Sequence, residues 1–338
     1  METLTVSVQE AETMKTVVRR RWGHARDVVE LAELPKPQPA DDEVVVRVRA
    51  SSINRADYYA LGGAAVLLRP MLGGFLRPKR ERIGHDFAGI VEAVGKRVPD
   101  LEPGDEVYGT QTGAFAQYVV AKDAVARKPA NLSFEQAATV PLAALTALHA
   151  LRASGRLEPG QRVLINGASG GVGIFAVQLA KALGAAQVTA VCRTRNVEQA
   201  RSLGADHVVD YTRQDYTRSE TRYDLIIDIA GNRSWRANRR VLEPGGRRVL
   251  VGMPKGNRLI GPMGRLVRFM VARQFSKERQ TFFILKPSRA DLTFVRELIE
   301  AGKLRAVVDR VYPLSEIADA LETMGEGHVQ GKLAVRIP

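Results

Sequence analysis

Short runs of hydrophobic and β-branched residues dominate the first third of the chain. Residues 43–49 read EVVVRVR, which combines β-branched content with partial alternation and predicts a strand. Glycines and Pro-Gly pairs punctuate the other runs of this kind. The further predicted strands are residues 15–19, 83–95, 101–109 and 114–121. The first 13 residues are polar and mixed, and we expect them to form a flexible extension before this mainly β region.

The pattern changes after Asn131, where strand and helix signals begin to alternate. Ser133 and Gln136 fit a capping box at the start of an apolar helix, and Pro141 is expected to kink or divide that helix. Predicted strands then cover residues 162–166, 187–192, 207–210, 223–230, 247–252 and 329–337, and predicted helices cover residues 171–183, 197–203 and 292–302. Strands that alternate with helices are typical of a parallel, doubly wound sheet.

The sharpest local signal is the sequence NGASGGVG at residues 166–173, between a predicted strand and a predicted helix. It fits the pattern A-x-G-x-x-G, in which small residues let the backbone approach a pyrophosphate. The following helix offers the anion unpaired N–H groups and a positive dipole end. The alternative is a tight strand–helix turn that binds no ligand. We expect a dinucleotide to contact Ala168, Ser169, Gly170, Gly171, Val172 and Gly173.

The end of the next predicted strand indicates which dinucleotide binds. An NAD site usually has Asp or Glu about 20 residues after the glycine motif, where it accepts hydrogen bonds from ribose hydroxyls. This strand instead ends Cys192-Arg193-Thr194-Arg195, without a carboxylate. Guanidinium groups match the oxygens of a 2′-phosphate, so Arg193, Thr194 and Arg195 predict NADPH rather than NADH. The alternative is that both arginines are only solvated.

Composition narrows the class of protein. The 338 residues suffice for two domains, and 45% hydrophobic with 26% charged residues excludes wholesale disorder. A formal net charge of +13 favours acidic partners such as nucleic acid, an anionic membrane or a phosphorylated ligand. The single cysteine, Cys192, excludes an intramolecular disulfide framework, and we expect it to be a buried or strand-end residue rather than a nucleophile. The N-terminus does not read as a signal peptide and no apolar run could span a membrane, so a cytoplasmic location is expected.

Seven stretches form a combination that is more specific than the glycine turn alone. They are SSINRADYYALGG, IGHDFAGIVEAVG, LEPGDEVYG, ATVPLAALTAL, VLINGASGGVGIFAVQLAKALGA, SLGADHVVDY and GKLAV. Together they make the chain, from about Met14 to its end, resemble the zinc-independent medium-chain dehydrogenase/reductases, close to the quinone oxidoreductase branch. The resemblance implies an α/β fold in which a Rossmann doubly wound parallel sheet is inserted in a β-rich, GroES-like catalytic domain.

The same resemblance implies domain boundaries and an activity. Residues 14–130 and 287–338 would form the discontinuous GroES-like catalytic domain, and residues 131–286 the Rossmann NADPH-binding domain, after an extension at residues 1–13. The active site would lie in the cleft between the two domains. There, hydride would pass from NADPH to a small-molecule quinone or α,β-unsaturated carbonyl compound. Such enzymes are often dimers, so a homodimer is expected.

The positions that bind catalytic zinc in zinc-containing relatives have mostly lost their ligands in this chain. The cysteine of those relatives falls on Asn54, the histidine on His85 and the third ligand on Leu142. A catalytic zinc normally needs three protein ligands and an open position, so we predict no metal and a structural or cleft-lining role for His85. A metal held by His85 with Asp57 or Asp86 is the alternative.

The resemblance places Asn54 and Tyr59 against the nicotinamide and the substrate, as the catalytic residues. An amide can orient the ribose or the substrate carbonyl, and a phenol can donate a proton to an enolate, although its pKa of about 10 makes it a poor base. Tyr58 is the neighbouring alternative, because on a helix the two rings point in different directions. Packing of either ring against the core is the competing interpretation.

Three more positions match cofactor-binding positions of similar enzymes. Thr146 matches a position near the nicotinamide, and Tyr211 matches one that stacks near or bonds the 2′-phosphate. Gly252, after a predicted strand, would let the backbone approach the cofactor. The alternatives are that Thr146 bonds the backbone of its own helix and that Tyr211 is a surface tyrosine.

Two stretches, residues 64–82 and 258–280, are basic and apolar and depart from the family pattern. Residues 255–286 hold eight Lys or Arg against Glu278, which accounts for about half of the net charge. Apolar residues at helical spacing give this stretch one apolar face; they are Leu259, Met263, Leu266, Val267 and Met270. The interpretations are a substrate lid, a membrane-surface contact, or a helix that packs on its own domain or on a dimer mate, and we favour packing over membrane contact.

Two other functions compete with the quinone or enone reductase. One is a ketone or aldehyde reductase of the alcohol dehydrogenase type that also uses NADPH, with Asn54 and Tyr59 polarising the carbonyl. The other is an NADPH-binding sensor or RNA-binding protein with little turnover. Aromatic residues make up only 6% of the chain and no RNA-binding motif is present, so no nucleic-acid partner is expected.

Overall fold

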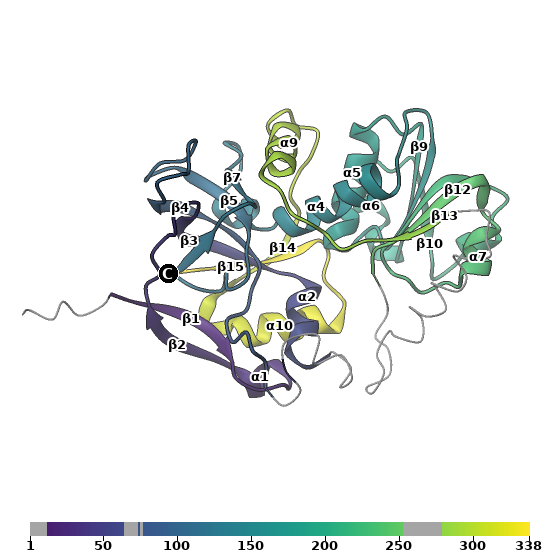
Figure 1. Cartoon of the computed structure of the whole chain (residues 1–338). Coiled ribbons are helices and arrows are strands. Elements are labelled where there is room, and N and C mark those ends of the chain that lie inside the picture. The colour runs from purple at the N-terminus through teal and green to yellow at the C-terminus, as the bar shows by residue number, and fades with distance from the viewer. Residues whose placement is uncertain (1–11, 64–73, 75–76, 253–278) are drawn as a thin grey trace, which may run out of the picture.

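The computed structural model describes residues 12–63, 74, 77–252 and 279–338. These residues form two lobes, each built around one large β-sheet (Figure 1). The lobe with antiparallel strands is called the mixed-sheet lobe, and the other the parallel-sheet lobe. The predicted α/β architecture, a parallel sheet inserted in a β-rich domain, is confirmed. Most of the predicted N-terminal extension and the apolar helix face predicted within 259–270 lie outside the described residues.

The mixed-sheet lobe contains a seven-stranded sheet in the order β14-β15-β3-β4-β5-β7, with β6 paired to β3, and a separate β1-β2 pair. Its strands are β1 (Thr13–Arg19), β2 (Val29–Pro35), β3 (Val44–Ile53), β4 (Asp86–Val94), β5 (Glu106–Thr110), β6 (Tyr118–Ala121), β7 (Val125–Arg127), β14 (Val308–Pro313) and β15 (Lys332–Arg336). In β3 the valines are buried while Arg47 and Arg49 are exposed, as partial alternation predicts. The C-terminal strand β15 lies antiparallel beside β3, so segments far apart in the sequence build one sheet.

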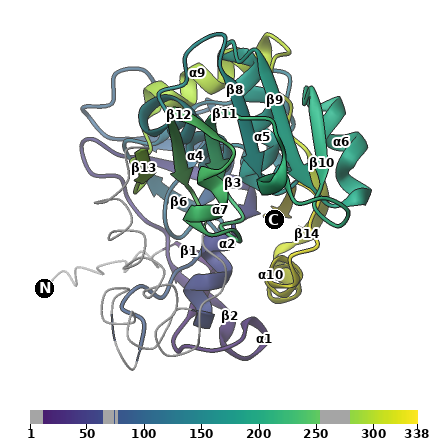
Figure 2. The same ribbon diagram turned by 90° about the vertical axis from the view of Figure 1, so that its right-hand side faces the viewer.

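The parallel-sheet lobe has six strands in the order β10-β9-β8-β11-β12-β13, and every neighbouring pair is parallel. The strands are β8 (Arg162–Asn166), β9 (Gln187–Cys192), β10 (His207–Asp210), β11 (Tyr223–Asp228), β12 (Leu242–Leu250) and β13 (Arg279–Phe282). Figure 2 looks onto this lobe, with α5 and α6 on its helical layers. The chain winds outward from β8 in both directions, so the strand order reverses at β8. Ligands of such sheets bind at the carboxyl ends of the strands at this reversal.

Helices cover the parallel sheet, lie between the lobes or pack on the mixed-sheet lobe. The first two groups are α3 (Phe134–Ala138), α4 (Pro141–His149), α5 (Gly171–Ala182), α6 (Val197–Ser202), α7 (Trp235–Arg239) and α9 (Arg289–Glu300), whereas α10 (Ile317–Glu326) packs on the mixed-sheet lobe. The predicted capping box is confirmed, because Ser133 Oγ accepts from Gln136 N and Gln136 Oε1 accepts from Ser133 N. The predicted break at Pro141 is confirmed too, since α3 ends before it and α4 begins on it. Within the described ranges, no helix is long and apolar enough to cross a membrane.

Candidate active site

The glycine turn lies at the carboxyl end of β8, where the strand order reverses. Gly167 has φ +95°, a left-handed conformation that favours glycine, and Gly170 caps α5 without any side-chain hydrogen bond. A Cβ added to Gly173 would overlap the Gly167 carbonyl oxygen, so this glycine lets helix and strand pack closely. A Cβ added to Gly170 would meet only that oxygen, at 3.7 Å. The uncapped helix start and the open face at Gly170 fit the pyrophosphate of a dinucleotide.

A buried ion pair, which the sequence pattern did not reveal, holds this turn in place. Asn166 Nδ2 donates to Asp228 Oδ1 over 2.7 Å, and the Gly231 N–H donates to the same oxygen over 2.9 Å. The other carboxylate oxygen of Asp228 accepts from the Arg248 guanidinium, and both side chains are at most 5% exposed. The available signal was an arginine inside the apolar strand RRVLVG and an aspartate at the end of YDLIID. The pair and Asn166 join the ends of β8, β11 and β12.

The glycine turn also contacts the beginning of β15, from the other lobe. The Gly331 N–H donates to the Ser169 carbonyl over 3.0 Å. A Cβ on Gly171 would lie 2.7 Å from Lys332 Cδ, so the lysine stem runs directly against the turn. The sequence pattern identifies Lys332 only as part of a terminal strand. The structure therefore adds a charged residue next to the predicted pyrophosphate site.

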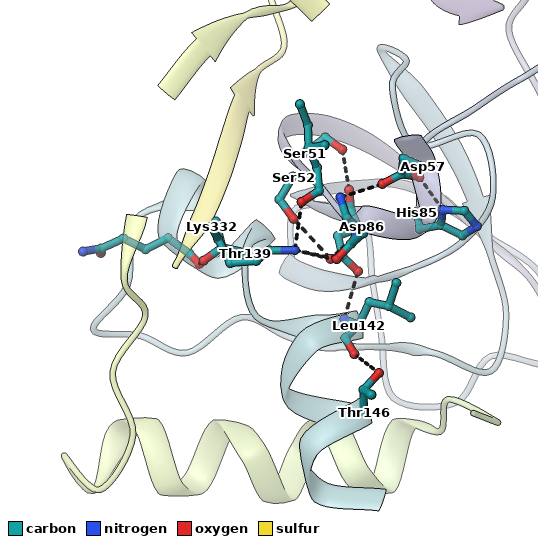
Figure 3. Close-up of polar contacts among 12 residues, drawn as sticks. Ser51, Ser52, Asp57, His85, Asp86, Thr139, Leu142, Thr146 and Lys332 are labelled. Atoms are coloured by element: carbon teal, nitrogen blue, oxygen red, sulfur yellow. Dashed lines mark hydrogen bonds and ion pairs between the residues drawn. The ribbon is translucent and has the colours of Figure 1, made fainter. Parts of the chain in front are cut away.

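Lys332 leads into a buried polar network between the lobes (Figure 3). Its Nζ donates to Asn54 Oδ1 over 2.5 Å and to the Ile53 carbonyl over 3.3 Å, and lies 3.5 Å from Asp86 Oδ2. Asn54 Nδ2 donates to that same carboxylate oxygen over 2.9 Å. The other oxygen of Asp86 accepts from the Leu142 N–H, at the start of α4, over 2.9 Å. Four segments far apart in sequence therefore meet at Asp86.

Burial controls the charges in this network. Lys332 and Asp86 are 2% and 0% exposed. Burial away from water raises the pKa of Asp86 and lowers the pKa of Lys332. The attraction between the two charges opposes both shifts. Each charge is therefore tolerated only because the other group and the surrounding hydrogen bonds are present.

The structure brings together the three positions that hold zinc in zinc-containing relatives. Asn54 and Leu142 both donate to Asp86, the residue that follows His85. Their side chains are an amide whose oxygen accepts from Lys332 and an apolar chain, which are not the donors that zinc prefers. Across the described part of the chain, no three His, Cys, Asp or Glu side chains are grouped so that they could hold a metal ion.

His85 contacts Asp57 rather than Asp86. His85 Nδ1 lies 2.5 Å from Asp57 Oδ1, and Asp57 Oδ2 accepts from the Asn54 N–H over 2.7 Å. Burial alone would lower the pKa of His85, but the charge of Asp57 and the hydrogen bond to it raise that pKa above its ordinary value. Since both oxygens of Asp57 are bonded, this carboxylate stays part of the protein framework.

The two adjacent tyrosines have different surroundings. A short helix, α2 (Arg55–Tyr58), precedes Tyr59, and the two rings lie 6.0 Å apart at an angle of 53°. Tyr58 packs against α10, where a Cβ on Gly325 would come within 2.5 Å of its ring. Tyr59 is half-buried, and its hydroxyl accepts from Arg55 Nε over 3.1 Å. The O–H hydrogen of Tyr59 is therefore available to a ligand, as its predicted role requires.

Asn54 and Thr146, which are predicted to contact the nicotinamide, already form hydrogen bonds within the protein. Asn54 keeps one Nδ2 hydrogen beyond its bonds to Asp86 and Lys332. Thr146 Oγ1 donates to the Leu142 carbonyl over 2.6 Å, so its hydroxyl can only accept from a ligand. Gly252 serves the packing of two strand ends, since a Cβ there would overlap the Ile229 carbonyl oxygen.

The predicted phosphate clamp lies at the ends of β9 and β10. Arg193, Thr194 and Arg195 are exposed, and Arg195 donates to the His328 carbonyl over 2.6 Å. Thr194 Oγ1 donates to Asp210 Oδ2 over 2.6 Å, so β10 supplies the carboxylate that is missing from β9. The Thr194 hydrogen bond is the main reason that the pKa of Asp210 is lowered. A carboxylate beside the arginines is a feature that the sequence pattern did not indicate.

Tyr211 and Cys192 lie next to the predicted phosphate clamp. Tyr211 is 44% exposed, which leaves its ring open to a ligand or to solvent. Cys192 is 1% exposed, and burial raises the pKa of its thiol to about 11. The expectation that Cys192 is buried is therefore confirmed, and its thiol is protonated at neutral pH.

Comparison with known proteins gives a consistent result across both lobes. The model of an alcohol dehydrogenase GroES-like domain matches residues 40–130, and that of a zinc-binding dehydrogenase matches residues 203–335. A quinone-oxidoreductase homolog of spinach chloroplasts is 32% identical over 342 residues, covering 96% of this chain and 99% of that protein. The chain belongs to the medium-chain dehydrogenase/reductase family, in its quinone oxidoreductase-like branch.

Two further relatives of this family define what the chain shares with it. The mitochondrial NAD(P)H oxidoreductase RTN4IP1 of mouse is 34% identical over 327 residues, covering 88% of this chain and 82% of that protein. The structure of a quinone oxidoreductase from Coxiella burnetii superposes with a TM-score of 0.83 at 30% identity, covering 97% of this chain and all of that one. This medium-chain dehydrogenase/reductase is thus an oxidoreductase of the quinone oxidoreductase type, with a nicotinamide cofactor and a small-molecule substrate.

Proposed function

We propose that this protein is an NADPH-dependent reductase that transfers hydride to quinones or α,β-unsaturated carbonyl compounds without zinc. The observation that carries the proposal is the network around Asp86. There, two of the three family zinc positions, Asn54 and Leu142, donate hydrogen bonds to a buried carboxylate instead of offering ligands to a metal. The glycine turn meets the same network through Lys332.

The available donors favour acceptors whose negative charge is delocalised. The nicotinamide supplies the hydride when it is bound, and the chain must hold the acceptor and stabilise the oxyanion. A simple ketone places this charge on one alkoxide oxygen, for which zinc-dependent enzymes use a Lewis acid. A quinone or an enone spreads the charge over a conjugated system, which neutral donors such as the Tyr59 O–H can stabilise. This difference favours the quinone or enone reductase over the ketone or aldehyde reductase.

Turnover tests the proposed activity directly. We expect purified protein to oxidise NADPH with a benzoquinone or an enone, under anaerobic conditions, far faster than with a simple ketone or aldehyde. Chelation of divalent metals should leave this rate unchanged. Tight NADPH binding without oxidation by any acceptor would instead favour the sensor function, and RNA binding that survives physiological salt would favour the RNA-binding one.

The first quantitative prediction concerns the preference for NADPH. Arg193 and Arg195 are the residues that we expect to bind the 2′-phosphate. Thr194, between them, donates to Asp210, which brings one negative charge close to the two arginines. We expect R193A/R195A to weaken NADPH binding about 10–100-fold and to leave NADH binding within about twofold, because only NADPH carries the phosphate. Calorimetric titration of both cofactors measures this difference.

A matched double variant controls for the loss of two positive charges. Arg26 and Arg97 are exposed arginines in surface ion pairs with Asp319 and Asp41. R26A/R97A should bind NADPH as the unmodified protein does. Equal binding of NADPH and NADH by the unmodified protein would contradict the clamp.

We also propose that the protein is a homodimer that uses the outer edge of the parallel sheet. β13 is the last strand of that sheet, and no described strand pairs with its outer edge. Next to it, Phe282 and Ile284 are 38% and 81% exposed. An unpaired strand edge flanked by apolar side chains is typical of a surface that pairs with another chain.

The second prediction tests this interface. We expect I284D to convert the dimer to a monomer at micromolar concentration in sedimentation velocity, because the new carboxylate would be buried without a partner. L31D is the matched control, since Leu31 is 52% exposed on β2, in the other lobe. A protein that sediments as a monomer without any substitution would rule out the dimer.

A further inference from the structure

His85 is a titratable residue of the candidate active site. No role toward the cofactor or the substrate has been assigned to it above. Its backbone is fixed on both sides, because Gly84 has φ +92° and the Gln111 N–H donates to the His85 carbonyl over 2.6 Å. The imidazole is 32% exposed, whereas the Asp57 carboxylate that it contacts is fully buried. The ring is therefore anchored at one end and open at the other.

The contact with Asp57 determines which nitrogen is available. Nδ1 lies 2.5 Å from Asp57 Oδ1, so Nδ1 carries a hydrogen and the neutral ring would leave Nε2 unprotonated. No described residue forms a hydrogen bond with Nε2. A carboxylate that holds one imidazole nitrogen and leaves the other open is the arrangement that orients histidines for proton transfer or for metal binding. Within the described residues, no three His, Cys, Asp or Glu side chains are grouped to hold a metal ion, and this arrangement favours proton transfer as the role of the pair.

The surroundings place His85 beside the substrate region. Asp57 is bonded to the Asn54 N–H and lies two residues before Tyr59, so the pair is tied to the predicted catalytic segment. On the other side, Asp86 holds the Leu142 N–H at the start of α4, one turn before Thr146. Figure 3 shows the His85 ring and the Leu142 side chain on the same side of Asp86, while Lys332 enters from the opposite side.

We propose that His85 is the proton donor of the reduction, a role that rests on the proposed reductase function. When hydride reaches the β-carbon of an enone or the ring of a quinone, an electron pair moves to the carbonyl oxygen. The Nε2–H bond of the His85 imidazolium then breaks and an O–H bond forms on that oxygen. The ring is left neutral, with its Nδ1–H still bonded to Asp57, and it regains a proton from water through its exposed edge.

Three charged groups near His85 act on its protonation. Asp57 and Asp86 favour the imidazolium, and Arg80 on the preceding segment opposes it. Their net effect raises the pKa of His85, so the donor form persists toward neutral pH. Imidazolium is in general a far stronger acid than a phenol, with reference pKa values of about 6.5 and about 10. His85 is therefore better suited to donate the proton, and Tyr59 to bind the developing oxyanion.

The test combines a measurement on the cofactor-free protein with one during turnover. The chain has five histidines, and ring resonances in NMR spectra can be followed from pH 5 to pH 9, with His85 assigned by its loss in H85Q. We expect the His85 midpoint to lie above those of the exposed histidines and to fall in D57N. This readout does not depend on cofactor binding or on activity.

The kinetic arm uses the same variants with a quinone and an enone. We expect H85Q to lower kcat by about 100-fold while KM changes little, because proton donation acts in the transition state. For the unmodified protein, kcat/KM should fall as the pH rises through the His85 midpoint, and this fall should move to lower pH in D57N. H207Q, which replaces the exposed histidine at the start of β10, is the matched control and should retain full activity.

The outcomes separate this proposal from the proposed function. Suppose that the unmodified protein turns over. A kcat of H85Q within twofold of the unmodified value, or an unshifted pH profile in D57N, would then contradict the assignment of His85 as proton donor. The proposed reductase function would not be affected. Absence of turnover with every quinone and enone would overturn both. If H85Q lacks a cooperative thermal transition, the paired shifts of the NMR midpoint and the pH profile in D57N decide the matter.

Discussion

Replacing Gly173 by alanine is expected to destabilise the parallel-sheet lobe by about 3 kcal/mol, whereas alanine at Gly170, the N-cap of α5, should cost no more than about 1 kcal/mol and weaken NADPH binding at least about 10-fold. Both residues belong to the same glycine turn, and both changes add one methyl group. The structure nevertheless assigns the two positions different tasks. Thermal unfolding and calorimetric titration of the two variants measure the two effects separately.

The difference follows from what each new Cβ would meet. At Gly173 it would overlap the Gly167 carbonyl oxygen and lie 2.6 Å from the Ala168 carbonyl carbon, and neither backbone atom can move without separating α5 from β8. At Gly170 it would meet a single atom at 3.7 Å, an ordinary contact, and φ is −81°, which alanine adopts readily. The methyl group at Gly170 would instead occupy the space into which a pyrophosphate must come.

Two results would contradict this division of roles. Similar unfolding temperatures for G170A and G173A would mean that α5 and β8 are not packed as the structure has them. Unchanged NADPH affinity in G170A would mean that the cofactor does not approach the turn at this residue. Gly104 provides a control for glycine replacement as such, because a Cβ there would meet nothing within 4 Å, although its φ of +98° makes alanine locally strained.

The glycine turn is predictable from the sequence because all its signals are local. β9 covers the predicted residues 187–192, and β8 and α5 begin at the predicted positions. Each of these elements is buried on both sides or carries a long apolar face, so the hydrophobic pattern alone identifies it. The Rossmann sheet and its ligand-binding edge could thus be predicted from the order of short apolar runs.

Elements at the edges and near the C-terminus were missed for a physical reason. β14 reads VDRVYP and is mostly exposed, so it forms only because β15 lies beside it. α10 did carry a readable signal, since Ile317, Ala320, Leu321 and Met324 are buried at helical spacing. β2 and β13 depend on a single neighbouring strand each, and their sequences alone do not distinguish them from loops.

The site was predictable only in part, because its network joins residues that are distant in sequence. Asn54, Tyr59 and His85 stood out through family positions, but their contacts did not. Asn54 and Lys332 are 278 residues apart, and no local pattern indicates that the lysine is buried. Likewise, the partner of His85 could not be chosen between Asp57 and Asp86 before the structure placed it against Asp57.

The prediction with the largest expected effect on the network concerns Lys332. We expect K332M to lower the free energy of unfolding by about 3–5 kcal/mol at pH 8, because the Asp86 carboxyl group would remain buried without its cation. K181M is the matched control, since Lys181 and its partner Asp206 are each 36% exposed, and such surface pairs contribute about 0–1 kcal/mol. Urea unfolding of both variants measures the difference.

The pH dependence of K332M identifies the cause of the loss. Burial already raises the pKa of Asp86, and Lys332 is among the groups that lower it, so removing the lysine raises that pKa further. A carboxyl whose folded-state pKa exceeds its unfolded value binds more protons in the folded protein between those two values. Stability therefore falls as the pH rises through this window, and the deficit of K332M should shrink as the pH is lowered toward 5. A deficit that does not change with pH would indicate lost packing of the lysine stem instead.

A double-mutant cycle decides whether the two charges act on each other. D86N should also be strongly destabilising, because it leaves Lys332 buried without a counter-charge while Asn54 and Leu142 keep donors aimed at the position. If the charges are coupled, K332M/D86N loses less stability than the sum of the two single variants. Strict additivity would mean that Lys332 and Asp86 contribute independently.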